Sequence, residues 1–226
     1  MKNSFFFLLL IFLSCEHKTA SLEKEESTVT APTFAEKSYE ENYFEFKPDT
    51  ISNVKIDGFD IRTSYNINGK KIVIGSYLPA NGNFSPHDSE ADNGLRLLFL
   101  NEKNELLFKS VGQMDAFMFE PHFYKNKTDQ KIIIVCQLAF EYFYGGEAFV
   151  FENGNIKHIG TLDVASTSEE ISLIDMLQIH EIGKKLIFSF KADSLLLEPG
   201  SKDLPIKNDN TSYIFQNGSL KFYKKL

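Results

Sequence analysis

The sequence lacks the short motifs that commonly identify a catalytic or cofactor site. It contains no Gly-x-Ser-x-Gly elbow, no phosphate-binding loop, no dinucleotide fingerprint, no HExxH and no zinc-spaced set of Cys and His. Of the two cysteines, Cys136 ends an apolar stretch that is typical of a buried strand, so a disulfide to Cys15 in a polar segment is not expected. From motifs we predict no catalytic residue, no metal ligand and no cofactor.

Positive charge is outweighed by negative charge. Lys and Arg number 24 against 31 Asp and Glu, which gives a formal net charge of −7. Phosphate binding needs a concentrated cationic face, but the lysines are scattered and lie mostly beside expected turns, as at Lys70-Lys71 and Lys184-Lys185. The sequence therefore predicts no nucleic-acid partner.

The N-terminal apolar run is too short to cross a membrane as a helix. Phe5–Leu13 follows Lys2 and has 9 residues, whereas a spanning helix needs about 20, so the run is typical of a secretory signal. It ends in Phe12-Leu13-Ser14-Cys15. A Leu and a small residue before a Cys resemble the lipobox of bacterial lipoproteins, from which Phe12 at the third position before the Cys departs mildly.

This resemblance implies a lipid anchor rather than an activity. In bacterial lipoproteins the chain is cut before the Cys, so here residues 1–14 would be the signal peptide and Cys15 would carry a diacylglycerol and usually an N-acyl chain such as palmitate. Two or three acyl chains hold a protein firmly to the lipid bilayer. We expect a cell-envelope location, at the outer membrane, with its periplasmic or surface face left open; the alternative is a plain secreted protein.

Residues 15–38 form the second predicted segment. They are rich in Glu, Lys, Ser and Thr and include Pro32. Such a composition cannot bury enough apolar surface to become ordered. We predict a flexible tether over 15–38 and a folded domain over 39–226.

Three hairpins organise the folded domain. The clearest is Glu147–Leu162, which turns at Asn153-Gly154, a pair that favours a two-residue turn with positive φ at both positions. Tyr213–Tyr223 repeats the pattern with a turn at Asn217-Gly218, and Leu97–Phe108 is a less regular copy. Two further strands are expected on either side of Asn68-Gly69. Three units of about four strands follow from this spacing, with Phe99, Phe151 and Phe215 in equivalent positions.

The repeat predicts an all-β fold of antiparallel meanders, repeated about three times. The strands around Gly145-Gly146, which we expect to form another two-residue turn, are apolar on both faces, so both faces must be covered. A propeller-like stack or a large β-sandwich would cover them. Three blades are few for a propeller, so either Tyr39–Ile61 supplies part of another blade or the fold is a curved meander or sandwich. One helix is expected at Ser168–Leu177, and Asp193–Asn210 is expected to be a long loop.

Two groups of residues are candidate binding residues. Tyr142, Tyr144 and Glu147 surround the Gly145-Gly146 pair, and aromatic rings beside a carboxylate suit a sugar ring or a protein loop; the alternative is cross-strand packing of Tyr142 on Phe149. Glu120 and His122 lie two residues apart, on the same side of an expected strand.

Two functions from different classes follow. The first is a non-enzymatic envelope lipoprotein that binds a protein or a glycan, or serves as an accessory module, through its loops. The alternative is an envelope hydrolase that acts on glycan or peptide with carboxylates such as Glu120 or Glu141, although no paired-carboxylate or triad pattern is visible.

Overall fold

The computed structural model describes residues 40–78, 93–128, 130–197 and 203–224, and all of them belong to one unit, 38–226. The predicted signal peptide, Cys15 and the predicted tether lie outside the described residues. Apart from one short helix, the regular structure of these described residues is β-strand, which confirms the all-β prediction. The elements in chain order are β1 (Glu40–Asn42), β2 (Phe44–Phe46), β3 (Asp49–Thr50), β4 (Phe59–Ile67), β5 (Lys70–Tyr77), β6 (Arg96–Leu100), β7 (Leu106–Lys109), β8 (Met118–Lys125), β9 (Ile132–Ala139), β10 (Phe143–Glu152), β11 (Asn155–Leu162), β12 (Val164–Ser166), α1 (Leu173–Met176), β13 (Leu177–Ile182), β14 (Lys185–Phe190), β15 (Ser194–Leu197), β16 (Leu204–Lys207), β17 (Ser212–Gln216) and β18 (Ser219–Tyr223).

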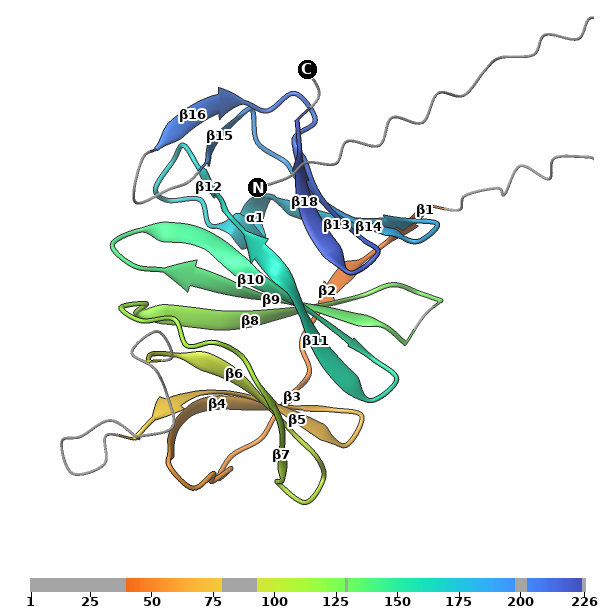
Figure 1. The fold of residues 1–226 in the computed structure, drawn as a ribbon. Coiled ribbons are helices and arrows are strands. Elements are labelled where there is room, and N and C mark those ends of the chain that lie inside the picture. Colours follow the sequence, from red (N-terminus) through yellow and green to blue (C-terminus); the bar gives the residue numbers. More distant parts are fainter. Residues whose placement is uncertain (1–39, 79–92, 129, 198–202, 225–226) are drawn as a thin grey trace, which may run out of the picture. The chain divides into compact units, whose positions relative to one another are not determined.

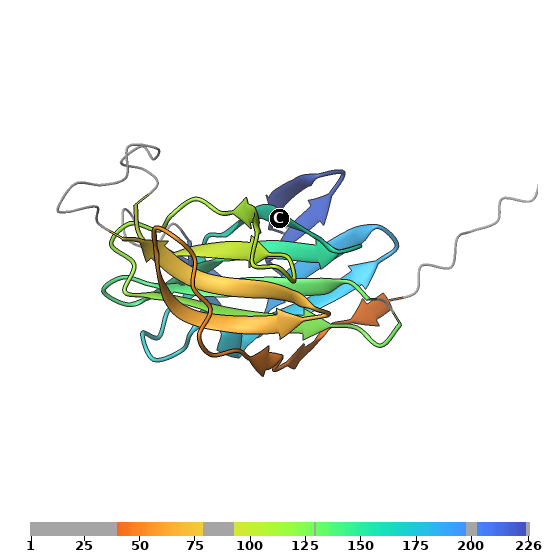
Figure 2. The same cartoon turned by 90° about the horizontal axis from the view of Figure 1, so that it is seen from below.

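Three antiparallel meanders of four strands form the body, as the sequence predicted. They are β4-β5-β6-β7, β8-β9-β10-β11 and β13-β14-β17-β18, and Figure 1 shows them as three stacked layers. Viewed from below, the strands of the first two layers run in roughly the same direction (Figure 2). Phe99, Phe151 and Phe215 each lie in the third strand of their meander, so their predicted equivalence is confirmed.

The hairpin turns at Asn-Gly pairs are also confirmed. Asn153 and Gly154 have φ values of 52° and 75°, and the pairs at Asn68-Gly69 and Asn217-Gly218 likewise take positive φ. In each case two strands pair directly on either side of the two residues. The chemistry of these turns sets the register of one hairpin in each layer.

The N-terminal segment supplies neither another blade nor a meander of its own. Instead β1 pairs with β13, β2 with β8 and β3 with β4, all antiparallel. One strand is therefore added beside the first strand of each meander, in the order third, second, first (Figure 1). We call residues 40–50 the lacing segment.

The middle sheet is covered on both faces. Alternate residues of β9 belong to different cores: Ile132, Ile134, Cys136 and Leu138 pack toward the first sheet, whereas Ile133 and Val135 pack toward the third sheet and α1. All eight residues of β9 are buried. This explains the two-sided apolar pattern of the sequence, and it makes the fold a layered sandwich with propeller-like meanders.

The expected turn at Gly145-Gly146 is wrong. The chain turns at 140–142, where Phe140 N–H donates to the Tyr142 carbonyl at 3.1 Å, and the two glycines lie inside β10 at a bulge between Phe143 and Gly146. Consequently Tyr142 does not pair with Phe149, which lies opposite Ile134 and His158. Gln137 fits the bulge, because its buried side chain donates to the Gly145 carbonyl at 3.1 Å.

Two other local expectations need correction. The helix is a single turn, and its capping residue is Ser172, whose hydroxyl and backbone N–H both bond to the carboxylate of Asp175. Residues 193–210, expected to be one long loop, contain β15 and β16, which join β12 in a small fourth sheet. Short strands interrupted by Pro and charged residues carry little periodicity, so the sequence pattern did not show them.

Gly145 should tolerate no side chain. Its φ is +47°, and a Cβ built there would lie 2.2 Å from the Leu162 carbonyl oxygen; Gly154 has a φ of +75° but open space around it. Left-handed strain alone costs about 1–2 kcal/mol. We expect Gly154→Ala to lower the free energy of unfolding by about that amount and Gly145→Ala by about 3 kcal/mol or more, as measured by urea denaturation. Equal losses in the two variants would contradict the bulge.

Candidate functional site

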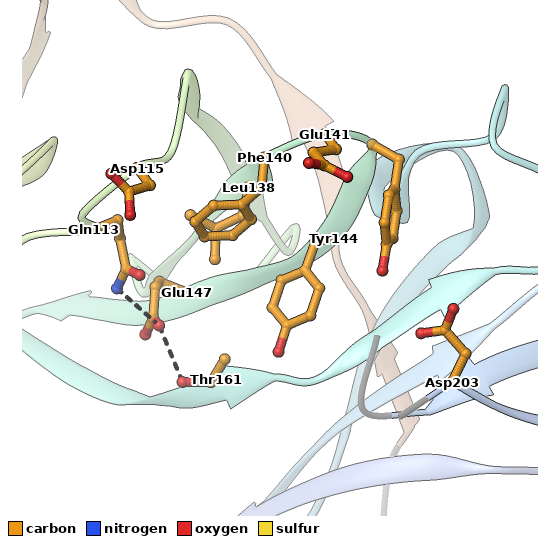
Figure 3. A pocket seen from close by; sticks show the side chains of 10 residues that line it. Gln113, Asp115, Leu138, Phe140, Glu141, Tyr144, Glu147, Thr161 and Asp203 are labelled. Carbon is orange, nitrogen blue, oxygen red and sulfur yellow. Dashed lines mark hydrogen bonds between the residues drawn. The ribbon is translucent and has the colours of Figure 1, made fainter. Parts of the chain in front are cut away.

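A pocket of about 980 Å³ opens beside the β9–β10 turn. Figure 3 shows side chains from three parts of the chain around it: the segment after β7, the β9–β10 turn with β9, β10 and β11, and the residue before β16. Its lining consists of Gln113, Asp115, Leu138, Phe140, Glu141, Tyr142, Tyr144, Glu147, Thr161 and Asp203. We call it the tyrosine pocket.

The structure brings together three of the five predicted binding residues. Tyr142, Tyr144 and Glu147 all line the tyrosine pocket. Glu120 and His122 do not; they lie on β8, and His122 Nδ1 is 2.8 Å from the Glu45 carboxylate on β2 of the lacing segment. The two residues therefore do not form a common site: Glu120 is exposed, and His122 contacts the lacing segment.

Glu147 is a buried carboxylate held by three side chains. It is 7% exposed. Gln113 Nε2 donates to Oε1 at 3.2 Å, Thr161 Oγ1 donates to the same oxygen at 3.0 Å, and His158 Nε2 lies in hydrogen-bonding contact with Oε2. Because several donors fix both oxygens, the negative charge has a defined position at the inner wall of the pocket.

Tyr144 is also fixed. Its hydroxyl donates to Asp163 Oδ1 at 2.7 Å, and its ring packs edge-on against Phe140 with centroids 5.5 Å apart. Burial, followed by the hydrogen bond and the charge of Asp163, raises the Tyr144 pKa above its ordinary value. The hydroxyl therefore stays protonated, and Tyr144 presents a neutral aromatic surface to a ligand.

The pocket is aromatic and acidic. Phe140, Tyr142 and Tyr144 contribute rings, and four carboxylates come from Asp115, Glu141, Glu147 and Asp203, without a basic side chain among the described lining residues. A wall of this kind offers hydrogen-bond acceptors, a negative potential and ring faces.

Sequence reasoning missed the residues that other elements bring to the pocket. Gln113 and Asp115 come from the connection between the first and second meanders, and Asp203 precedes β16. Thr161 lies opposite Glu147 in the β10–β11 ladder because a bulge shifts the register between Ala148 and Phe149, whereas a regular hairpin would place Gly160 there. Gln113 is placed by its backbone N–H, which bonds to the Leu95 carbonyl at 2.8 Å; no short-range pattern indicates that contact.

A smaller cavity of about 400 Å³, which shares Glu147 with the tyrosine pocket, is lined by Ser110 and His158 among others. These are the residue types of a hydrolytic triad, but Ser110 is not arranged as a nucleophile. Its hydroxyl donates to the Val111 carbonyl and accepts from the Leu97 N–H, both at 3.0 Å. The geometry therefore describes a structural serine, since a triad requires the hydroxyl to donate to the histidine.

Cys136 is likewise no candidate nucleophile. It is fully buried in β9, and burial together with the nearby charge of Glu147 raises the pKa of its thiol well above the ordinary value. The thiol stays protonated and inaccessible.

No three His, Cys, Asp or Glu side chains in the described ranges lie together as metal ligands would. Within the same ranges, no helix has the length and apolar character needed to span a membrane.

Replacing the buried carboxylate should destabilise the protein. In Glu147→Gln the amide offers only one acceptor oxygen to Gln113, Thr161 and His158, so we expect the free energy of unfolding to fall by about 1–3 kcal/mol. Glu141→Gln removes the same charge at an exposed position of the same pocket and should change it by less than about 0.5 kcal/mol. Urea denaturation of both variants tests this; equal effects would show that the contacts of Glu147 contribute nothing.

Comparisons with models of protein families, with curated proteins and with solved structures found no match for this chain.

Proposed function

We propose that this protein is a bacterial envelope lipoprotein, anchored through acylated Cys15, whose β-sandwich binds a protein or glycan ligand in the tyrosine pocket without transforming it. The observation that carries the binding role is the combination of three aromatic rings with a fixed, buried carboxylate around one cavity of about 980 Å³. Pockets of about 300–1,000 Å³ with a few positioned polar groups are the usual form of ligand sites.

The pocket supports binding because its key groups are already in place. Glu147 is held by Gln113, Thr161 and His158, and Tyr144 by Asp163. A ligand that uses these groups does not have to order them, so less conformational entropy is lost on association. Tyrosine adds contact area at small entropic cost because it has few rotatable bonds.

The hydrolase alternative has less support. Of its two predicted carboxylates, Glu120 lies outside the pocket and Glu141 lies at its exposed edge. Ser110 and Cys136 are not placed as nucleophiles, for the reasons given above. Of the two predicted carboxylates, Glu141 is therefore the one that could act in a hydrolase at this pocket.

The anchor is supported by the sequence Phe12-Leu13-Ser14-Cys15 after a short apolar run. The folded domain then begins about 25 residues after the acceptor cysteine, at Glu40 of β1. The predicted tether, residues 15–38, would carry the pocket away from the membrane surface toward its ligand.

Cys15→Ser should release the protein from the membrane. Without a thiol no thioether-linked diacylglycerol forms, so the variant should lose palmitate labelling and move to the soluble fraction. Cys136→Ser leaves the acceptor in place and should keep both properties. Unchanged labelling and sedimentation of Cys15→Ser would overturn the anchor.

Tyr142→Ala should weaken ligand binding while the fold is retained. The probes are an array of envelope oligosaccharides and an array of random peptides, applied to the full-length protein in detergent micelles. For the probes that bind, we expect dissociation constants to rise about 30-fold, the effect of removing a tyrosine hot spot. Tyr223→Ala, which removes a tyrosine that is 52% exposed outside the pocket, should change them less than about twofold.

Two results would count against a binding module. Cleavage of an array member that Glu141→Gln abolishes would favour the hydrolase. Binding that is unaffected by Tyr142→Ala would place the ligand site elsewhere on the molecule.

A further inference from the structure

Exposed apolar side chains are concentrated in one stretch beside the tyrosine pocket. Eleven large apolar residues are exposed among the described residues, and five of them fall between positions 106 and 117. These five are Leu106, Leu107, Val111, Met114 and Phe117, with exposures from 41% to 65%. Clustered exposed apolar side chains, methionine and phenylalanine in particular, are typical of interaction surfaces.

The last three residues belong to the segment that also builds the pocket. Gln113 and Asp115 line the pocket, while Val111, Met114 and Phe117 alternate with them along the same connection between β7 and β8. We call residues 111–117 the apolar rim. On the far side of the pocket Leu204, which is 54% exposed, follows the lining residue Asp203.

The apolar rim is exposed although its backbone is held. Gln113 N–H bonds to the Leu95 carbonyl at 2.8 Å, and Phe117 N–H bonds to the Ala139 carbonyl at 3.1 Å, so one end is tied to the first sheet and the other to the second. Arg62 Nη1 also donates to the Phe117 carbonyl at 3.2 Å. The side chains are therefore presented to solvent by a positioned turn.

Charge indicates what this surface would accept. The adjoining pocket has carboxylates at Asp115, Glu141, Glu147 and Asp203 beside three rings, and no basic side chain among its described lining residues. A cationic group gains from both features, since carboxylates pair with it and ring faces attract it. An anionic group would be repelled.

We propose that the tyrosine pocket and the apolar rim together bind an extended polypeptide segment in which a Lys or Arg stands close to apolar residues. The basic side chain enters the pocket, and the apolar neighbours cover Met114 and Phe117. This inference rests on the proposed binding function and narrows it from a protein or a glycan to a protein of stated chemistry.

A glycan and a membrane explain the same surface less well. A neutral sugar would use the rings and acceptors of the pocket but would leave Val111, Met114 and Phe117 in water. An anionic bilayer would gain from the apolar residues but would meet the negative pocket and a chain of net charge −7. Only a basic and apolar ligand uses both parts.

The test uses the full-length protein in detergent micelles and a systematic set of peptides of about twelve residues. Each position of the peptides is varied among a basic residue, an acidic residue, an apolar residue and serine. Binding is measured by fluorescence polarisation at low and at high salt. We expect peptides with Lys or Arg next to Leu or Phe to bind and acidic counterparts not to bind. Raising the salt concentration about tenfold should weaken binding, because the pairing charges are partly exposed.

Two double variants separate the parts of the surface. Asp115→Asn with Glu141→Gln removes charge only, and Asn suits the positive φ of 64° at position 115; Met114→Ser with Phe117→Ser removes apolar area only. Each should raise the dissociation constant about tenfold or more. The controls Glu152→Gln and Ile171→Ser, exposed positions away from the pocket, should change it less than about twofold.

Each other outcome has a defined meaning. Binding of oligosaccharides that Tyr142→Ala abolishes, without peptide binding, would keep the proposed function and overturn this inference. Binding to anionic phospholipid vesicles that requires Met114 and Phe117 would replace the peptide by a membrane surface. Peptide binding that both double variants retain would show that the site lies elsewhere and would overturn this inference. If no probe binds at all, both proposals are overturned.

Discussion

The backbone hydrogen bonds of the lacing segment are the contacts on which the arrangement of the three sheets depends. Each meander begins with a strand that would be an open edge, and β3, β2 and β1 pair with those edges in turn. Side chains reinforce the pairing: Glu181 accepts from the Tyr43 hydroxyl at 2.8 Å and from Lys131 at 2.8 and 2.9 Å, which joins the lacing segment to the second and third sheets. A propeller protects such edges by closing into a ring. Here the lacing segment covers them by adding one short strand to each.

The tyrosine pocket exists because β10 is irregular. At the bulge, Gly145 takes a positive φ close to the Leu162 carbonyl, a position that a residue with a Cβ could not occupy. The extra length of β10 brings Tyr142 and Tyr144 beside Glu147 at the end of the middle sheet, where the connection carrying Gln113 crosses from the first sheet. The local bulge in β10 and the long-range connection that carries Gln113 thus form one site.

The sequence predicted the features that local chemistry decides. Asn-Gly pairs located three hairpin turns, and the two-sided apolar pattern of Ile132–Cys136 predicted a central layer. Gly145-Gly146 was misread because a glycine pair suits both a turn and a bulge, and only the register with β9 distinguishes them. Three of five predicted binding residues met in one pocket, whereas Gln113 and Asp203 arrive through contacts that no short-range pattern encodes. Glu120 and His122 shared a strand face but not a cavity.

The lacing segment has a consequence for the order of folding. Glu40 pairs with Ile182, 142 positions further along the chain, so the strand that is synthesised first finds its partner only when the third meander exists. Hairpins at the Asn-Gly turns can close within microseconds, and β3 can pair with β4 as soon as the first meander forms, but β1 stays without its partner strand until β13 has been made. The interval in which this chain is open to edge-to-edge association therefore lasts until nearly all of it has been made.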